Sequence, residues 1–298
     1  MIVRPLSRSA TLGLAALVML TSGLTSCRRK EVPPPPVATP SITLSHDRAP
    51  LGSPIDITYK FIVANDAHFA EDYRVLVHVV DADDELIFAF DHNPQVPTTQ
   101  WKPGQTIEYT RTEFIPVYPY VGEASIQLGL HSTVNQKRLP LAGDDVGQNA
   151  YKVARIQLQP QTENVFTVFK EGWHPAEVAE HNATVEWQWT KKDATLSFKN
   201  PKKDSLFYFD VDNPGGVFSD SQHVTISLGG QVVDELTLKP KDREMRKIPL
   251  KAPQLGSEDV AEIVISVDKT FVPAVVNSSS KDPRELGVRV FHAFVDPR

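Results

Sequence analysis

The stretch Ile-Asp-Ile-Thr-Tyr-Lys-Phe-Ile-Val at residues 55–63 decides the fold class of this 298-residue chain. Successive side chains of a β-strand point to opposite faces, so every second residue of the stretch lies on the same face. One face is entirely apolar, whereas the other carries Asp56, Thr58 and Lys60. The alternation therefore predicts a β-strand that directs these residues into a core: Ile55, Ile57, Tyr59, Phe61 and Val63.

Similar short apolar stretches recur on both sides of this strand, separated by turn residues. At residues 73–81 both faces are apolar, which is typical of a central strand. Strands are expected at residues 42–46, 55–63, 73–81, 86–91, 106–114, 124–131 and 151–158. This series predicts an immunoglobulin-like β-sandwich over residues 41–160.

A second β series follows the short polar segment 160–164, where we place the domain boundary. Leu-Phe-Tyr-Phe at residues 206–209 indicates a strand buried on both faces. Strands are expected at residues 165–169, 184–190, 195–199, 205–212, 223–228, 232–238, 246–250, 261–267 and 287–294. They predict a jelly-roll-like sandwich over residues 165–298, so the expected fold is all-β, with two tandem β-sandwiches.

Two turn motifs support this strand series. Asp81–Glu85 lies between two expected strands, and its aspartates favour a tight hairpin turn. Calcium binding is the alternative, although the segment lacks the later Gly and spaced Glu of an EF-hand loop. Pro103-Gly104 is the pairing of a type II turn, which requires a positive φ at the glycine.

Residues 1–26 have the pattern of a signal peptide, with a basic start and an apolar run at residues 10–20. The run is too short to span a bilayer, which takes ~20 apolar residues. The following Leu-Thr-Ser-Cys, at residues 24–27, resembles the lipobox of bacterial lipoproteins. That resemblance implies that the Cys27 thiol receives diacylglycerol, the signal is cleaved, and the new amine is acylated with a fatty acid such as palmitate. An ordinary secretory signal and an uncleaved anchor are the alternatives.

Residues 27–40 include the consecutive prolines 33–36. Consecutive prolines form an extended polyproline II helix, so we expect a tether behind the lipid, with a Pro-rich recognition ligand as the alternative. In bacterial lipoproteins, Asp after the lipidated cysteine implies retention in the inner membrane. Arg28 occupies that position here. The resemblance thus favours a bacterial cell-envelope protein anchored in the outer membrane, on its periplasmic or surface face.

Composition and motif spacing argue against several functional classes. The net charge of −6 disfavours a nucleic-acid partner, which would select a basic face. With the only cysteine lipidated, the folded domains lack a thiol for disulfides, metal binding or nucleophilic catalysis. The histidines show no metal-ligand spacing, and no nucleophile elbow or nucleotide-binding glycine loop is present. We therefore expect no metal, no cofactor and no catalytic residue.

Tryptophans supply the candidate ligand-binding residues. Trp187 and Trp189 are two residues apart in an expected strand and therefore share a face. Indole rings stack on the apolar faces of sugars, and Glu186 or Asp282 could orient the sugar hydroxyls. Core packing of both strand tryptophans is the alternative. Trp173 lies in an expected loop and is the better candidate for an exposed platform.

Several motifs, taken in order, resemble β-sandwich modules attached to bacterial membrane glycosyltransferases and other envelope-polysaccharide proteins. In the second half they are Gly-Trp-His-Pro at 172–175, Trp-Gln-Trp at 187–189, Phe-Val-Pro-Ala at 271–274 and Asp-Pro-Arg-Glu-Leu-Gly-Val at 282–288. In the first half, Pro-Thr-Thr-Gln-Trp-Lys-Pro-Gly at 97–104 and Gly-Leu-His at 129–131 resemble the companion module, which has Tyr where this chain has His131. The sequence contains no transferase membrane domain. The resemblance therefore implies an accessory, glycan-facing role without transferase activity.

Asp282 and Arg284 are candidate ligand-binding residues that also have a structural interpretation. Charge-assisted hydrogen bonds between them can fix a loop, and Gly287 can admit a close backbone approach. The leading hypothesis is a non-enzymatic envelope lipoprotein that binds surface polysaccharide or another glycan. The alternatives are a protein-interaction module of an envelope complex and, less favoured, a glycan hydrolase with carboxylates from distant strands.

Overall fold

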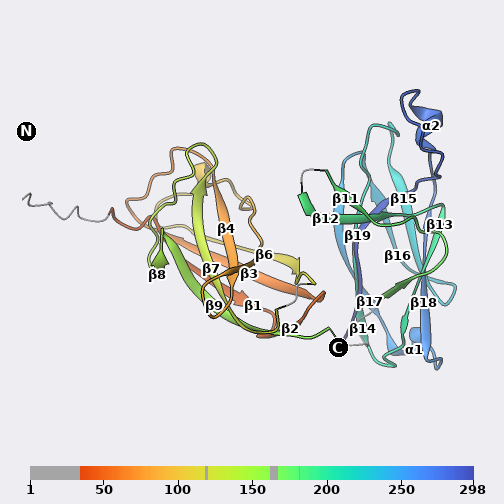
Figure 1. The fold of residues 1–298 in the computed structure, drawn as a ribbon, viewed down its shortest axis with the longest axis horizontal. Coiled ribbons are helices and arrows are strands. Elements are labelled where there is room, and N and C mark those ends of the chain that lie inside the picture. The colour runs from red at the N-terminus through yellow and green to blue at the C-terminus, as the bar shows by residue number, and fades with distance from the viewer. Residues whose placement is uncertain (1–33, 118–119, 162–166, 181) are drawn as a thin grey trace, which may run out of the picture. The chain divides into compact units, whose positions relative to one another are not determined.

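The structure, a computed structural model, describes residues 34–117, 120–161, 167–180 and 182–298. The signal peptide, Cys27 and most of the expected tether lie outside these ranges, as does most of the expected domain boundary. Residues 35–298 form one compact unit. It is almost entirely β-structure, built as two β-sandwiches in tandem, as the sequence predicts (Figure 1).

The first sandwich contains the sheets β1-β3-β6 and β2-β9-β7-β4-β5, with β8 paired to β9. Its N-terminal segment changes sheets, because β1 pairs antiparallel with β3 and β2 pairs parallel with β9. This arrangement is that of an immunoglobulin-like sandwich. The elements are β1 Ala38–Leu44, β2 Arg48–Pro50, β3 Pro54–Val63, β4 Tyr73–Val80, β5 Leu86–Ala89, the 3-10 helix η1 Thr98–Gln100, β6 Thr106–Phe114, β7 Gly122–Ser132, β8 Asp144–Gly147 and β9 Ala150–Gln159.

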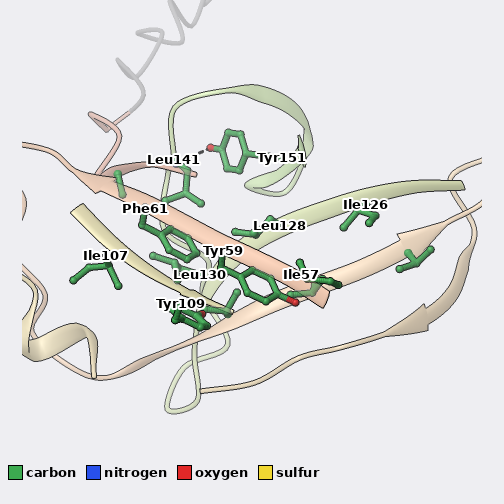
Figure 2. Packing of buried hydrophobic residues seen from close by; sticks show 14 of the residues in the cluster. Ile57, Tyr59, Phe61, Ile107, Tyr109, Ile126, Leu128, Leu130, Leu141 and Tyr151 are labelled. Atoms are coloured by element: carbon green, nitrogen blue, oxygen red, sulfur yellow. Dashed lines mark hydrogen bonds between the residues drawn. The ribbon is translucent and has the colours of Figure 1, made fainter. Parts of the chain in front are cut away.

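Strand β3 lies at the centre of the first core, which confirms the alternation predicted from residues 55–63. Its inward side chains are at most 2% exposed. Figure 2 shows Tyr59 and Phe61 packed among side chains of β6 and β7. The loop between β7 and β8 also packs into this core through Leu141. The backbone N–H of Leu141 donates to the Tyr151 hydroxyl at 2.9 Å.

The second sandwich contains the sheets β10-β13-β18-β15-β16 and β11-β12-β19-β14-β17. In each sheet the strand order follows the double Greek key of a jelly roll, with β10 and β11 added at the edges. The elements are β10 Thr167–Phe169, β11 Glu177–Ala179, β12 Asn182–Trp189, β13 Asp193–Lys199, β14 Ser205–Asp212, β15 Gln222–Leu228, β16 Gln231–Leu238, β17 Arg243–Leu250, α1 Ala252–Leu255, β18 Val260–Val267, α2 Pro273–Val276 and β19 Arg289–Pro297. No helix in the described part of the chain is long and apolar enough to cross a membrane.

Short strands account for most differences from the expected series. The sequence pattern does not predict β2, β8 or β11, because each is too short for alternation and is fixed by its partner strand. β1 begins at Ala38, inside the stretch expected to be tether. Both turn predictions are confirmed: Asp81 Oδ1 accepts the backbone N–H of Asp83 and Glu85, and Gly104 has a φ of 72°.

Candidate functional site

The outer face of the sheet β11-β12-β19-β14-β17 carries the candidate site. In β14, Phe207, Phe209 and Val211 are fully buried in the core of the second sandwich. Strand alternation therefore directs Asp210 and Asp212 to the outer face. The outward residues that we treat together as the tryptophan–arginine face are Trp187, Trp189, Asp210, Asp212, Arg243, Arg289, Phe291 and His292.

One row of this face crosses four strands. Trp189 pairs with Arg289, Arg289 with Asp212, and Asp212 with Arg243 in the strand register. Directly paired residues of a sheet point to the same face, so the four side chains are neighbours. Val290 pairs with Val211 and His292 with Asp210, so a β-bulge leaves Phe291 without a partner in β14. The bulge brings both the Phe291 ring and His292 towards this face.

The two strand tryptophans share this outer face, as their spacing predicts. The guanidinium carbon of Arg289 lies 4.9 Å from the ring centre of Trp187 and 5.9 Å from that of Trp189. Neither indole belongs to the inter-sheet core. Trp189 is nevertheless buried, packed edge-on against Phe271, whereas Trp187 is half-buried. The Trp187 Nε1 atom is buried without a hydrogen-bond partner among the described residues.

The charges on the face are paired. Arg289 Nε donates to Asp212 Oδ1 at 2.9 Å, and Arg243 donates to both oxygens of Asp210 at 2.9 and 2.6 Å. Burial opposes ionisation of Asp210, but hydrogen bonds from Arg243 and His292 outweigh it and lower the pKa of the Asp210 carboxyl. Arg243 also lies over the Phe291 ring at 3.7 Å. Each arginine therefore combines a carboxylate partner with an aromatic one.

A cavity of about 440 Å³ lies beside the face and brings two predicted residues together, Glu186 and Trp187. Gln188, Arg243 and Phe291 also line it. Phe114 and neighbouring residues of the first sandwich complete the lining. Its volume falls in the range of ~300–1,000 Å³ that is usual for ligand pockets. Its mixture of aromatic walls and a few polar groups is typical of sites that orient a small ligand.

Asp282 and Arg284 do not line this cavity. Asp282 Oδ1 accepts the Arg284 backbone N–H at 3.0 Å and Nε at 2.9 Å, and Arg284 Nη1 donates to Glu177 Oε1 at 2.6 Å. The hydrogen bonds from Arg284 lower the pKa of Asp282 to about 2. Glu177 pairs with Trp187 across β11 and β12. Asp282 and Arg284 thus fix a loop, as the structural interpretation predicts. Through Glu177 they also support the strand that carries Trp187.

Gly287 allows the close approach of two backbone segments that the sequence predicts. Its backbone N–H donates to the Thr190 carbonyl at 2.7 Å. An added Cβ would meet Thr190 Oγ1 and would lie 2.8 Å from the Lys191 carbonyl oxygen. Glycine is therefore required where the chain enters β19 beside the end of β12.

Trp173 does not form the exposed platform that the sequence predicts. The side chain is half-buried and packs against the core of the second sandwich. Its Nε1 donates to the Thr195 carbonyl at 2.9 Å, and its ring contacts Phe169 edge-on at 4.7 Å. An indole in a loop suggested exposure, but the loop folds back onto β13, and Trp173 packs against the core there.

Sequence reasoning missed the charged half of the face. Asp212 and Arg289 are 77 residues apart in the chain and meet only through the pairing of β14 with β19. One signal was present: Asp210 and Asp212 lie at the end of an otherwise apolar strand. Buried carboxylates require cationic partners, so arginines on the adjacent strands follow from their burial.

Comparison with known proteins gives no family assignment. No protein-family model matches the sequence, and no curated protein matches it. Among solved structures, a GH115 4-O-methyl-α-glucuronidase with specificity for decorated arabinogalactans aligns with 17% identity and a TM-score of 0.33, covering 51% of this chain and 20% of that one. A CBM36 carbohydrate-binding module in complex with calcium and xylotriose gives 12% identity and a TM-score of 0.25, covering 44% of this chain and 98% of the module.

A β-glucuronidase from Bacteroides uniformis aligns with 11% identity and a TM-score of 0.29, covering 88% of this chain and 30% of that one. Two of these three matches are segments of much longer enzymes. At TM-scores this low, the matches assign neither an activity nor a ligand to this chain.

Proposed function

We propose that this chain is a non-enzymatic cell-envelope lipoprotein that binds glycan in the cavity beside Trp187. The observation that carries the proposal is the position of Trp187: its indole lines a cavity of about 440 Å³ together with Glu186, Gln188 and Arg243. This combination suits a ligand with both apolar and hydroxyl-bearing surfaces.

The chemistry of a sugar ring matches these groups. Its C–H face can stack on indole, while carboxylate, amide and guanidinium groups can bond to its hydroxyls.

A glycan-binding assay tests the site. Residues 35–298, one compact unit with two apolar cores, can be applied to a glycan array and then titrated with the glycans that are retained. Trp187→Ala should weaken binding at least tenfold, equivalent to ~1.4 kcal/mol. Phe218→Ala is the matched control, because this partly exposed ring does not line the cavity. Equal affinities for the Trp187→Ala variant and the unchanged chain would contradict glycan recognition at this site.

The proposed location follows from the N-terminal sequence. Lipid on Cys27 would hold the protein at the bacterial envelope, with the outer membrane favoured by Arg28. Two or three acyl chains give firm attachment, since each buried methylene contributes ~0.8 kcal/mol. A clickable palmitate analogue should label the full chain in bacterial cells and leave Cys27→Ala unlabelled. Equal label on both chains would exclude this anchor.

A protein-interaction function is the second candidate, supported by strand β16. This edge strand pairs with β15 on one side, and Val232 on it is 56% exposed. Exposed strand edges can add a strand from another protein. Crosslinking in intact cells followed by co-purification would separate the two candidates, because a stoichiometric protein partner without glycan favours the interaction module.

A further inference from the structure

We propose that the glycan site continues into a second, polar subsite and that its ligand is a neutral oligosaccharide several sugar units long. The second subsite is a cleft of about 740 Å³ lined by residues of both sandwiches. This inference rests on the proposed function, because it extends the same site. It adds the length and the charge class of the ligand.

The two hollows share three lining residues. Phe114, Arg243 and His292 line both the cavity beside Trp187 and the polar cleft. The rings of Phe114 and His292 stack with centres 3.9 Å apart and planes 7° apart. These two rings come from β6 and β19, so a chain-like ligand that occupies both hollows would pass along the edges of the stacked pair.

The two hollows differ in chemistry. Aromatic and aliphatic side chains dominate the first, where Trp187 and Phe291 lie close together. The cleft is lined mainly by polar side chains, among them the hydroxyls of Thr110 and Thr112. One sugar unit would stack in the cavity, and the following units would bind chiefly through hydroxyl groups in the cleft.

The charges of the cleft select a neutral ligand, because each cation on its walls has a carboxylate partner. Arg111 contacts Glu113 at 2.7 Å and Arg243 contacts Asp210 at 2.6 Å. Lys247, the remaining cation of the lining, contacts Asp56 at 2.6 Å. An anionic ligand would have to displace these carboxylates, leaving them without their partners. Neutral hydroxyls can accept or donate at the free positions of the paired groups without breaking the pairs.

Chain-length dependence tests the subsite in the full-length protein. Calorimetric titrations would use gluco-, xylo- and manno-oligosaccharides of two to six units, with uronic-acid oligosaccharides of equal length alongside. The readout is the ratio of affinities for the hexasaccharide and the disaccharide. We expect a ratio of at least tenfold for a neutral series and no gain in affinity with length for the acidic series.

Two variants fill the cleft from opposite walls. Met245→Trp, on β17, should reduce the affinity ratio to about one, and Thr110→Tyr, on β6, provides the same test if the first variant fails to fold. Val232→Trp is the matched control, because it adds the same ring at an exposed position outside both hollows. It should keep the ratio of the unchanged chain.

Failures of the two proposals are distinguishable. Disaccharide binding that depends on Trp187, with no gain in affinity on lengthening, overturns the second subsite and supports the proposed function. A length gain that survives in folded Met245→Trp or Thr110→Tyr also overturns the subsite. Stronger binding of acidic than of neutral chains overturns the charge assignment. No binding of any series overturns both proposals.

Discussion

The imidazole of His92 bonds through Nε2 to the hydroxyl of Tyr109 at 2.8 Å inside the first sandwich. His92 is 6% exposed, and its Nδ1 bonds to the Phe90 carbonyl at 2.8 Å. A backbone carbonyl can only accept, so Nδ1 carries the proton and Nε2 accepts from the Tyr109 hydroxyl. The core therefore holds a neutral histidine, and burial lowers the pKa of His92 to about 4.

This histidine makes stability depend on pH. Between about pH 6.5 and about pH 4 the unfolded chain binds a proton at His92 that the folded chain does not. Stability should therefore fall as the pH falls through that window, by about 3 kcal/mol from this group. His92→Gln keeps an acceptor for Tyr109 and should remove this part of the slope in urea denaturation. His68→Gln, at an exposed position, is the control for the substitution itself.

Gly172 should be far less tolerant of alanine than Gly230. Both glycines have left-handed backbones, with φ of 83° and 78°, so alanine strains each by ~1–2 kcal/mol. Around Gly230 an added Cβ meets open space, whereas at Gly172 it collides with the Asp193 carbonyl and lies 2.6 Å from the Ala194 Cα. Gly172→Ala should lose at least ~2 kcal/mol more in denaturation experiments. Equal losses would show that the backbone near Trp173 relaxes freely.

Arg289 should be essential to the tryptophan–arginine face. Arg289→Met leaves the Asp212 carboxylate, 7% exposed, without its direct ion-pair partner and should cost about 3 kcal/mol of stability. Adding Asp212→Asn should restore part of that loss, because the unpaired charge is then gone. Denaturation followed by tryptophan fluorescence measures both effects, since Trp187 and Trp189 contact the guanidinium. A double variant no more stable than Arg289→Met would argue against a charge-based cost.

Arg284 should control the order of the loop before β19. Arg284→Ala removes its bonds to Asp282 and Glu177, so amide exchange should accelerate in residues 268–286 and in β11. Arg284→Lys should restore protection only in part, because an ammonium group cannot reproduce the guanidinium fork. Lys281→Ala, at an exposed position of the same loop, is the control and should leave exchange unchanged.

Alternation predicts most of this fold because each sandwich buries one face of every long strand. The inward residues of β3 and the doubly buried β14 follow directly from it. Strands β2, β8 and β11 have no such pattern, since their partners and not their side chains define them. The shared face of Trp187 and Trp189 follows from the two-residue period. Their partner Arg289 does not, because strand pairing between distant segments places it there.

The sheet change of the N-terminal segment has a mechanical consequence. Tension that enters through the residues before β1 pulls along β1, which is hydrogen-bonded to β3, and along β2, which is hydrogen-bonded in parallel to β9. Chain leaving the end of β9 pulls in the opposite direction, so the β2–β9 ladder is loaded in shear. Its hydrogen bonds must then break together rather than one after another, as in a peeled hairpin. The first sandwich is thereby built to resist stretching between its two ends.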